Sequence, residues 1–262
     1  MTSGFRIGFG VLVAMAAMPG MACGATPASG DFGLSVGAEY SSGKYGGDRR
    51  IEDFYVPVTG WYRGDGYTIR LTVPYLSVTA PQGTLVQGPG GQLIPGEGPD
   101  TTEQGLGDVI LGLTVYDVWT AADGSLVLDV GGKVKFGTAD EDQFLGTGET
   151  DFTFQADLVK YWSGFTGLAS AGYVLRGEPD QFDLDNGFVA ALGGMFGPAA
   201  GTQFGAFIEY QQAAYRFNDD RMELAGVIGW RLGRGQVLLS TSAGLSDSAP
   251  DWTAGFTFYP GW

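Results

Sequence analysis

A two-residue alternation of polar and apolar side chains runs through most of this sequence and restricts what the chain can fold into. Segments 126–137, 203–212 and 221–232 each place aliphatic and aromatic residues at every second position, with polar residues and glycines between them. Phe207 is the exception in the second of these segments. Repeated over about ten residues, this pattern is typical of strands that face lipid on one side and water on the other.

A helical membrane protein is excluded by the same residues. After the N-terminal region, no segment contains the roughly 18 consecutive apolar residues that a transmembrane helix requires. In lipid, the alternative that satisfies every backbone N–H and C=O group is a closed β-barrel. The sequence therefore predicts an all-β fold, a transmembrane antiparallel β-barrel.

Counting the alternating segments predicts twelve strands, an even number, as is usual in bacterial single-chain barrels. The predicted strands are 31–41, 51–63, 67–77, 105–118, 126–137, 150–161, 165–176, 186–197, 203–213, 221–232, 236–245 and 251–262. The connections between them alternate between short and long, which predicts short periplasmic turns and longer extracellular loops. The predicted outer loops are 42–50, 78–104, 138–149, 177–185, 214–220 and 246–250.

The N-terminus is typical of a secretory signal peptide. Arg6 supplies a positive charge, residues 7–18 form an apolar run, and small residues follow. We expect cleavage after Ala25, so that residues 1–25 are the signal peptide and residues 26–262 form the barrel in the outer membrane of a Gram-negative bacterium. Cleavage before Cys23, as in a lipoprotein, is the alternative; either way, a chain with one cysteine has no internal disulfide.

The charge of the chain and its last strand indicate its partners. A net charge of −15 repels phosphates and argues against nucleic acid. Phe256, Phe258 and Trp262 share one face of the closing strand, as in strands that the barrel-assembly machinery recognises, although Pro260 departs from that pattern. The expected partners are outer-membrane lipid, the barrel-assembly machinery during biogenesis, and a small-molecule solute.

The chain has no histidine, which removes most enzymes that outer-membrane barrels form, because these use histidine as a base. We predict no enzyme activity, no catalytic residue and no cofactor. Metal sites built on histidine or cysteine are also excluded. The acidic residues Asp140, Glu141 and Asp142 have the oxygen ligands of a Ca²⁺ or Mg²⁺ site. They lack the spacing of an EF-hand loop and fit a solvated surface better, so no metal site is predicted.

Charged residues with inward parity are the candidates for lining a pore. These predicted pore-lining residues are Glu39, Arg70, Asp108, Asp129, Lys133, Lys135, Asp151, Asp157, Glu209, Arg221, Glu223 and Arg231. Neighbouring strands would bring the lysines close to Asp151 and Asp157, so one interpretation is that the charges pair across the wall. The other is a transverse electric field that orients polar solutes, and a paired wall is compatible with it.

The number of strands limits the width of the pore. Eight strands are filled by side chains, whereas sixteen to eighteen leave a wide channel, so twelve predict a narrow path for small solutes. The 78–104 segment, the longest predicted loop, either folds inward as a constriction or stands outside as a cap.

Several phrases resemble the outer-membrane "putative MetA-pathway of phenol degradation" transporter family. They include GLGDVILG at 105–112, KVKFGTAD at 133–140, GTGETDF at 146–152, GYVLRG at 172–177, NDDRMEL at 218–224 and GLSDSAPDWTAGF at 244–256. The resemblance implies a porin-like channel for passive transport and uptake of aromatic compounds. The competing hypothesis is a non-conducting envelope barrel with a structural or surface-interaction role, and ion conductance separates the two.

Overall fold

The computed structural model describes residues 30–86, 93–179, 183–197 and 201–260. The predicted signal peptide and its cleavage site lie outside the described residues, as does Trp262. No helix in the described ranges is long and apolar enough to cross a membrane.

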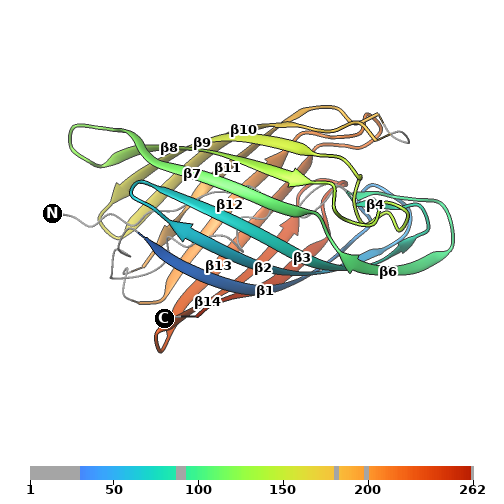
Figure 1. The fold of residues 1–262 in the computed structure, drawn as a ribbon, viewed down its shortest axis with the longest axis horizontal. Coiled ribbons are helices and arrows are strands. Elements are labelled where there is room, and N and C mark those ends of the chain that lie inside the picture. The colour runs from blue at the N-terminus through green and yellow to red at the C-terminus, as the bar shows by residue number, and fades with distance from the viewer. Residues whose placement is uncertain (1–29, 87–92, 180–182, 198–200, 261–262) are drawn as a thin grey trace.

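The chain forms one closed antiparallel barrel (Figure 1). Most strands pair with their neighbours along the chain, β3 pairs with both β6 and β7, and β1 pairs with β15 to close the wall. The wall strands are β1 (Asp31–Gly43), β2 (Ile51–Arg63), β3 (Tyr67–Pro81), β6 (Asp100–Leu106), β7 (Val109–Thr120), β8 (Leu126–Phe136), β9 (Asp151–Trp162), β10 (Phe165–Leu175), β11 (Gly187–Phe196), β12 (Gln203–Gln211), β13 (Arg221–Leu232), β14 (Gly235–Gly244) and β15 (Trp252–Tyr259). Strands β4 (Leu85–Val86) and β5 (Leu93–Ile94) form a separate small hairpin.

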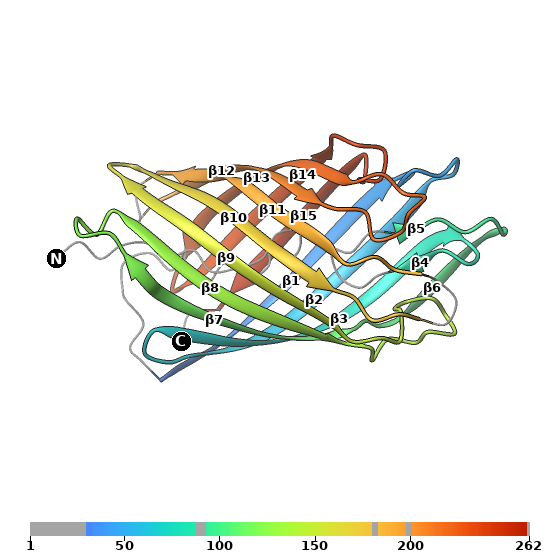
Figure 2. The same cartoon turned by 90° about the horizontal axis from the view of Figure 1, so that it is seen from above.

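The predicted count of twelve is confirmed, because β6 and β7 occupy one position in the wall. The predicted fourth strand, 105–118, is wrong in detail: it breaks at Gly107 and Asp108, and β6 begins five residues earlier than predicted. Strand β3 pairs with β7 as far as the Thr72–Ile110 pair and then with β6 from Tyr75–Leu106 onward. Together, β3 and β6 form an arm at one end of the barrel (Figure 2).

The two faces of the wall follow the predicted parity. Phe204 and Ile208 are 46% and 47% exposed on the outer face of β12, and Leu224 lies directly opposite Ile208 on β13. Gln203 and Phe207 point inward and are buried. Phe207 departs from the polar pattern because it packs with Met195, Ala225, Val227 and Leu238 in an apolar cluster on the inner face.

Short turns gather at one end of the barrel, as predicted. Strands β9 and β10 are joined by Ser163 and Gly164, and β13 and β14 by Gly233 and Arg234. Gly164 has a φ of 78° and Gly233 a φ of 62°, backbone conformations that glycine adopts without the steric cost of a side chain. The opposite end carries the long connections.

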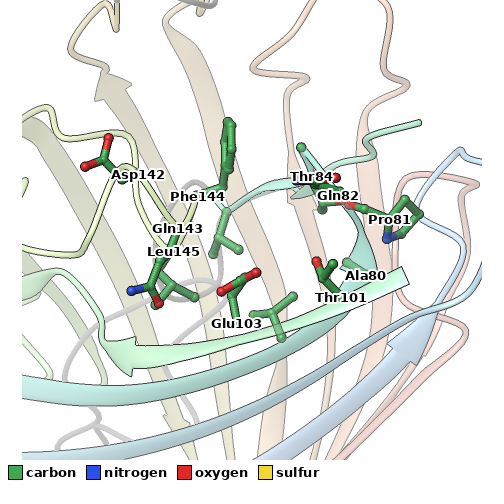
Figure 3. Close-up of a pocket in the computed structure, with 13 residues that line it drawn as sticks. Ala80, Pro81, Gln82, Thr84, Thr101, Glu103, Asp142, Gln143, Phe144 and Leu145 are labelled. Carbon is green, nitrogen blue, oxygen red and sulfur yellow. The ribbon is translucent and has the colours of Figure 1, made fainter. Parts of the chain in front are cut away.

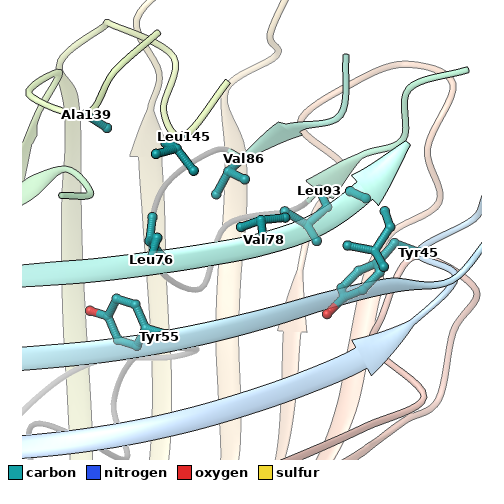
Figure 4. Packing of buried hydrophobic residues seen from close by; sticks show 10 residues of the cluster. Tyr45, Tyr55, Leu76, Val78, Val86, Leu93, Ala139 and Leu145 are labelled. Atoms are coloured by element: carbon teal, nitrogen blue, oxygen red, sulfur yellow. The ribbon is translucent and has the colours of Figure 1, made fainter. Parts of the chain in front are cut away.

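Part of the predicted 78–104 loop folds inward at this end. Val86 and Leu93 of the β4–β5 hairpin pack against the inward face of the wall in the outer apolar cluster (Figure 4). The cluster comprises Tyr45, Ile51, Tyr55, Leu76, Val78, Ala80, Val86, Leu93, Ala139 and Leu145. The other side of the hairpin, Leu85 and Ile94, contacts Leu184 from the loop after β10. The hairpin therefore reaches between loops of different strands, and its described part follows the inward-folded alternative.

Candidate functional site

The inner face of the barrel carries four groups of polar side chains, and Lys135 of β8 is at the centre of the first. Its Nζ lies 3.1 Å from Asp108 Oδ2 and 3.1 Å from Asp151 Oδ2, and it donates a hydrogen bond of 3.0 Å to Thr147 Oγ1. Asp108, which is fully buried, also accepts hydrogen bonds from the backbone N–H groups of residues 138 and 139. This group, called here the Lys135 node, joins the break between β6 and β7 to the 137–150 loop.

The second group lies further along β8 and β9, toward the periplasmic end. Asp129 and Asp157 are directly opposite each other in the sheet. The Gln155 side chain donates one hydrogen bond of 2.8 Å to Asp157 Oδ1, whereas the backbone N–H of Asp117 donates one of 2.7 Å to Asp129 Oδ1. Lys133 interacts electrostatically with Asp157 without a direct ion pair in the described residues. Both lysines were predicted to lie close to carboxylates of the neighbouring strands. Of the two, Lys135 forms close ion pairs.

Arg70 of β3 forms the third group with hydroxyl groups. Its guanidinium donates hydrogen bonds of 3.0 Å to Thr114 and 3.3 Å to the Tyr116 hydroxyl, which in turn donates to Thr68. Arg70 and Thr68 are both buried, so this group tightens the β3–β7 seam. Among the described residues, no carboxylate lies within ion-pair distance of Arg70.

The fourth group is acidic and lies near the outer ends of β1, β12 and β13. Arg221 forms an ion pair with Glu223, whose second oxygen accepts a hydrogen bond of 2.5 Å from Ser242. Glu209 is directly opposite Glu223, and Glu39 interacts electrostatically with Arg221 and both of these glutamates. We call these residues, together with Asp53, the lumen acidic cluster. It holds four carboxylates and one arginine.

Sequence reasoning missed Asp53. It lies on β2 between the inward-facing Ile51 and Tyr55, and it interacts electrostatically with Glu39. Face assignment within 51–63 would have found it, since it shares the parity of those two residues. Arg231 is the predicted residue that stands apart from the four groups: it is exposed at the turn end of β13.

A cavity of about 90 Å³ opens beside the β3–β6 arm (Figure 3). Its apolar walls include Val78, Val86, Phe144 and Leu145, and its acidic residues are Glu103 and Asp142. The sequence did not indicate this cavity, because its walls come from the arm, the small hairpin and the 137–150 loop.

Two loop residues at this end titrate away from their usual range. Burial raises the pKa of the Tyr45 phenol above its ordinary value, and the neutral hydroxyl lies 2.7 Å from that of Ser41. Burial lowers the pKa of the Arg176 guanidinium, and nearby Asp151 and Asp185 oppose that shift. In the acidic loop, Asp140 accepts hydrogen bonds from the Asp142 backbone and the Gln143 side chain. No group of three metal-ligating side chains occurs in the part of the chain that the structure describes.

The closed barrel has apolar residues on its outer face and charged residues on its inner face. The sequence model of the family described as "Putative MetA-pathway of phenol degradation" matches residues 27–259. The chain belongs to this family. No curated protein matches the sequence.

Solved structures share the fold of this family member at low sequence identity. The COG4313 outer membrane channel from Pseudomonas putida F1 superposes with a TM-score of 0.73 at 13% identity, covering 93% of this chain and 99% of that one. The NanC porin superposes with a TM-score of 0.51 at 11% identity, covering 86% of this chain and 98% of that one. At these identities, the likeness shows the fold alone.

Proposed function

We propose that this family member is an outer-membrane channel through which small solutes, including aromatic compounds, pass without an energy source. The observation that carries the proposal is the contrast between the two faces of the wall. The outer face suits lipid, whereas the inner face holds ionisable side chains such as Lys133 and Glu39. Charged side chains that line a barrel lumen are what polar and ionic solutes need in order to cross lipid.

The proposal includes the predicted route to the membrane. Residues 1–25 would direct export, residues 26–262 would form the barrel, and the barrel-assembly machinery would insert it into the outer membrane of a Gram-negative bacterium. In this proposal the predicted pore-lining residues form the lumen wall, except Arg231, which is exposed at the turn end of β13. Aromatic solutes are proposed for two reasons. The family description refers to phenol degradation, and the inner face of the wall carries apolar side chains, those of the outer apolar cluster, as well as charged groups.

One observation favours the alternative, a non-conducting barrel of the envelope. The outer apolar cluster is buried, and the β4–β5 hairpin extends from it to Leu184 and, through a hydrogen bond of 3.2 Å to the Leu93 carbonyl, to Asn218. A mouth sealed by these contacts would block solutes.

Planar bilayers containing the purified protein distinguish the two functions. A channel gives discrete current steps in potassium chloride, and proteoliposomes that contain it take up small polar solutes faster than empty liposomes. A folded protein that gives neither current steps nor uptake would support the non-conducting alternative.

A further inference from the structure

The cavity beside the β3–β6 arm has the size and walls of a site for part of an organic molecule. Its volume of about 90 Å³ is several times the roughly 10–15 Å³ that one water molecule needs. Val78 and Ala80 come from β3, Val86 from the small hairpin, and Phe144 and Leu145 from the 137–150 loop. Walls of this kind favour an apolar group, because it gives up contact with water on binding.

Glu103 introduces a negative charge among these apolar walls. It lies on β6 directly opposite Val78, and its inward parity is set by the exposed neighbours Thr102 and Gln104. Figure 3 shows it between Leu145 and Thr101 at the cavity. The side chain is half-buried and makes no hydrogen bond or ion pair with another described residue. A carboxylate that is partly removed from water gains from a cation placed beside it.

The residues around the cavity supply no such cation. Among the described residues that line it there is no lysine or arginine, and Asp142 adds a second carboxylate at its rim. Arg49, which contacts the arm, is bound to Asp100 and to the carbonyl of residue 98. The cavity therefore attracts positive charge and repels anions.

The same sign of charge recurs deeper in the barrel. The lumen acidic cluster has four carboxylates, and its arginine, Arg221, is already paired with Glu223. Glu39 and Asp53 have no hydrogen bond or ion pair with described residues. A cation that leaves the cavity toward the lumen would thus reach a second region with excess negative charge.

We propose that the cavity is the first binding site for small organic cations with an apolar body, in particular protonated primary amines carried by an aromatic ring. The ammonium group lies against Glu103, and the ring lies against Val78, Val86 and Phe144. The proposal rests on the proposed channel function and names its solute class. Uncharged rings bind more weakly because they lack the ion pair, and aromatic carboxylates are excluded by repulsion.

Three probes with one ring and different charges test this site: benzylammonium, benzyl alcohol and benzoate. Each is titrated calorimetrically into the full chain in lipid nanodiscs, with empty nanodiscs subtracted. Benzylammonium should bind wild-type protein about tenfold more tightly than benzyl alcohol, as expected for a hydrogen bond between charged groups. Glu103→Gln should remove that difference. Glu97→Gln, the same change at an exposed position in the segment that leads into β6, should preserve it.

Glu103→Lys provides a second variant, in which benzoate should become the preferred probe. Equal binding of all three probes to wild-type protein, no binding of any probe, or equal effects of the Glu97 and Glu103 variants would each overturn the proposal. Potassium chloride conductance of the same preparations is measured separately. Current without probe selectivity refutes the cation site alone, whereas selective binding without current refutes the channel and leaves the site.

Discussion

Single residues in the lumen divide into those that hold the wall together and those that are available to ions. Lys135 belongs to the first kind, because two carboxylates and a hydroxyl surround its ammonium group. Lys133 is only two residues away on the same face, yet it interacts with Asp157 electrostatically at a distance and does not form a close ion pair with it. Parity predicted that both lysines point inward. It could not predict which of them is paired, since that depends on the path of the 137–150 loop.

Replacing Lys135 by methionine should destabilise the barrel by about 3–5 kcal/mol, because the fully buried Asp108 and the partly buried Asp151 would lose this cation. Urea unfolding in lipid vesicles, followed by tryptophan fluorescence, measures this cost. Lys160→Met is the matched control, because the ammonium of Lys160 donates a hydrogen bond to the Ser125 hydroxyl, an uncharged group. Its cost should be much smaller, and equal costs for the two variants would refute the role assigned to the Lys135 node.

Replacing Lys133 by glutamate should shift the ion preference of a conducting channel toward cations. The field of a lumen charge is poorly screened in a narrow, low-dielectric passage. The reversal potential in a salt gradient measures this preference. Lys44→Glu is the control: this lysine is exposed in an outer loop, where a Debye length of about 8 Å at physiological salt screens its charge. A folded Lys133 variant with the wild-type reversal potential would place Lys133 outside the ion path.

At the scale of elements, sequence periodicity predicted the strands that cross lipid. It did not predict the arm formed by β3 and β6. Alternation is strong only where one face must be apolar. There is no apolar side chain in residues 100–105, which have the sequence DTTEQG. Strand β6 therefore pairs with β3 but has no lipid-facing row of apolar side chains like that of β12. The break at Gly107 and Asp108 was not predicted either, since Asp108 there contacts Lys135 and the 137–150 loop, which are distant in the sequence.

Removing the β4–β5 hairpin should raise single-channel conductance several-fold while leaving the barrel folded. The neck of the hairpin is narrow: a Cβ atom built on Gly83 would lie 4.0 Å from the Gly96 Cα. Two glycines in place of residues 84–95 can therefore join the arm. The β3–β6 pairs from Tyr75 to Pro81 remain intact.

The control for this deletion is a variant that shortens the acidic segment 140–142 and leaves the hairpin in place. Its conductance should change little at high salt. Unchanged conductance after removal of the hairpin, in protein that still shows the gel mobility of a folded barrel, would mean that the hairpin does not obstruct the path.

At the scale of the whole molecule, alternating connection lengths predicted which loops share an end, and the structure places them together. Orientation in the cell is a further step. Cysteine in place of Glu141 should react with a membrane-impermeant maleimide on intact cells, because the long loops are expected outside. Cysteine in place of Asp65, in a short turn, should react only after lysis. The reverse labelling pattern would invert the assigned orientation.

The contact between β1 and β15 has a consequence for how the chain reaches this structure. Ala38 pairs with Phe256, whereas the other wall pairings join strands that are much closer to one another in the sequence. Closing so long a segment costs more chain entropy than forming a hairpin, and contacts between distant residues slow folding. Until β15 pairs with β1, both edges of the sheet present unpaired backbone groups that can bind other strands. The pairing of β15 with β1 thus determines how long the forming barrel remains open to aggregation.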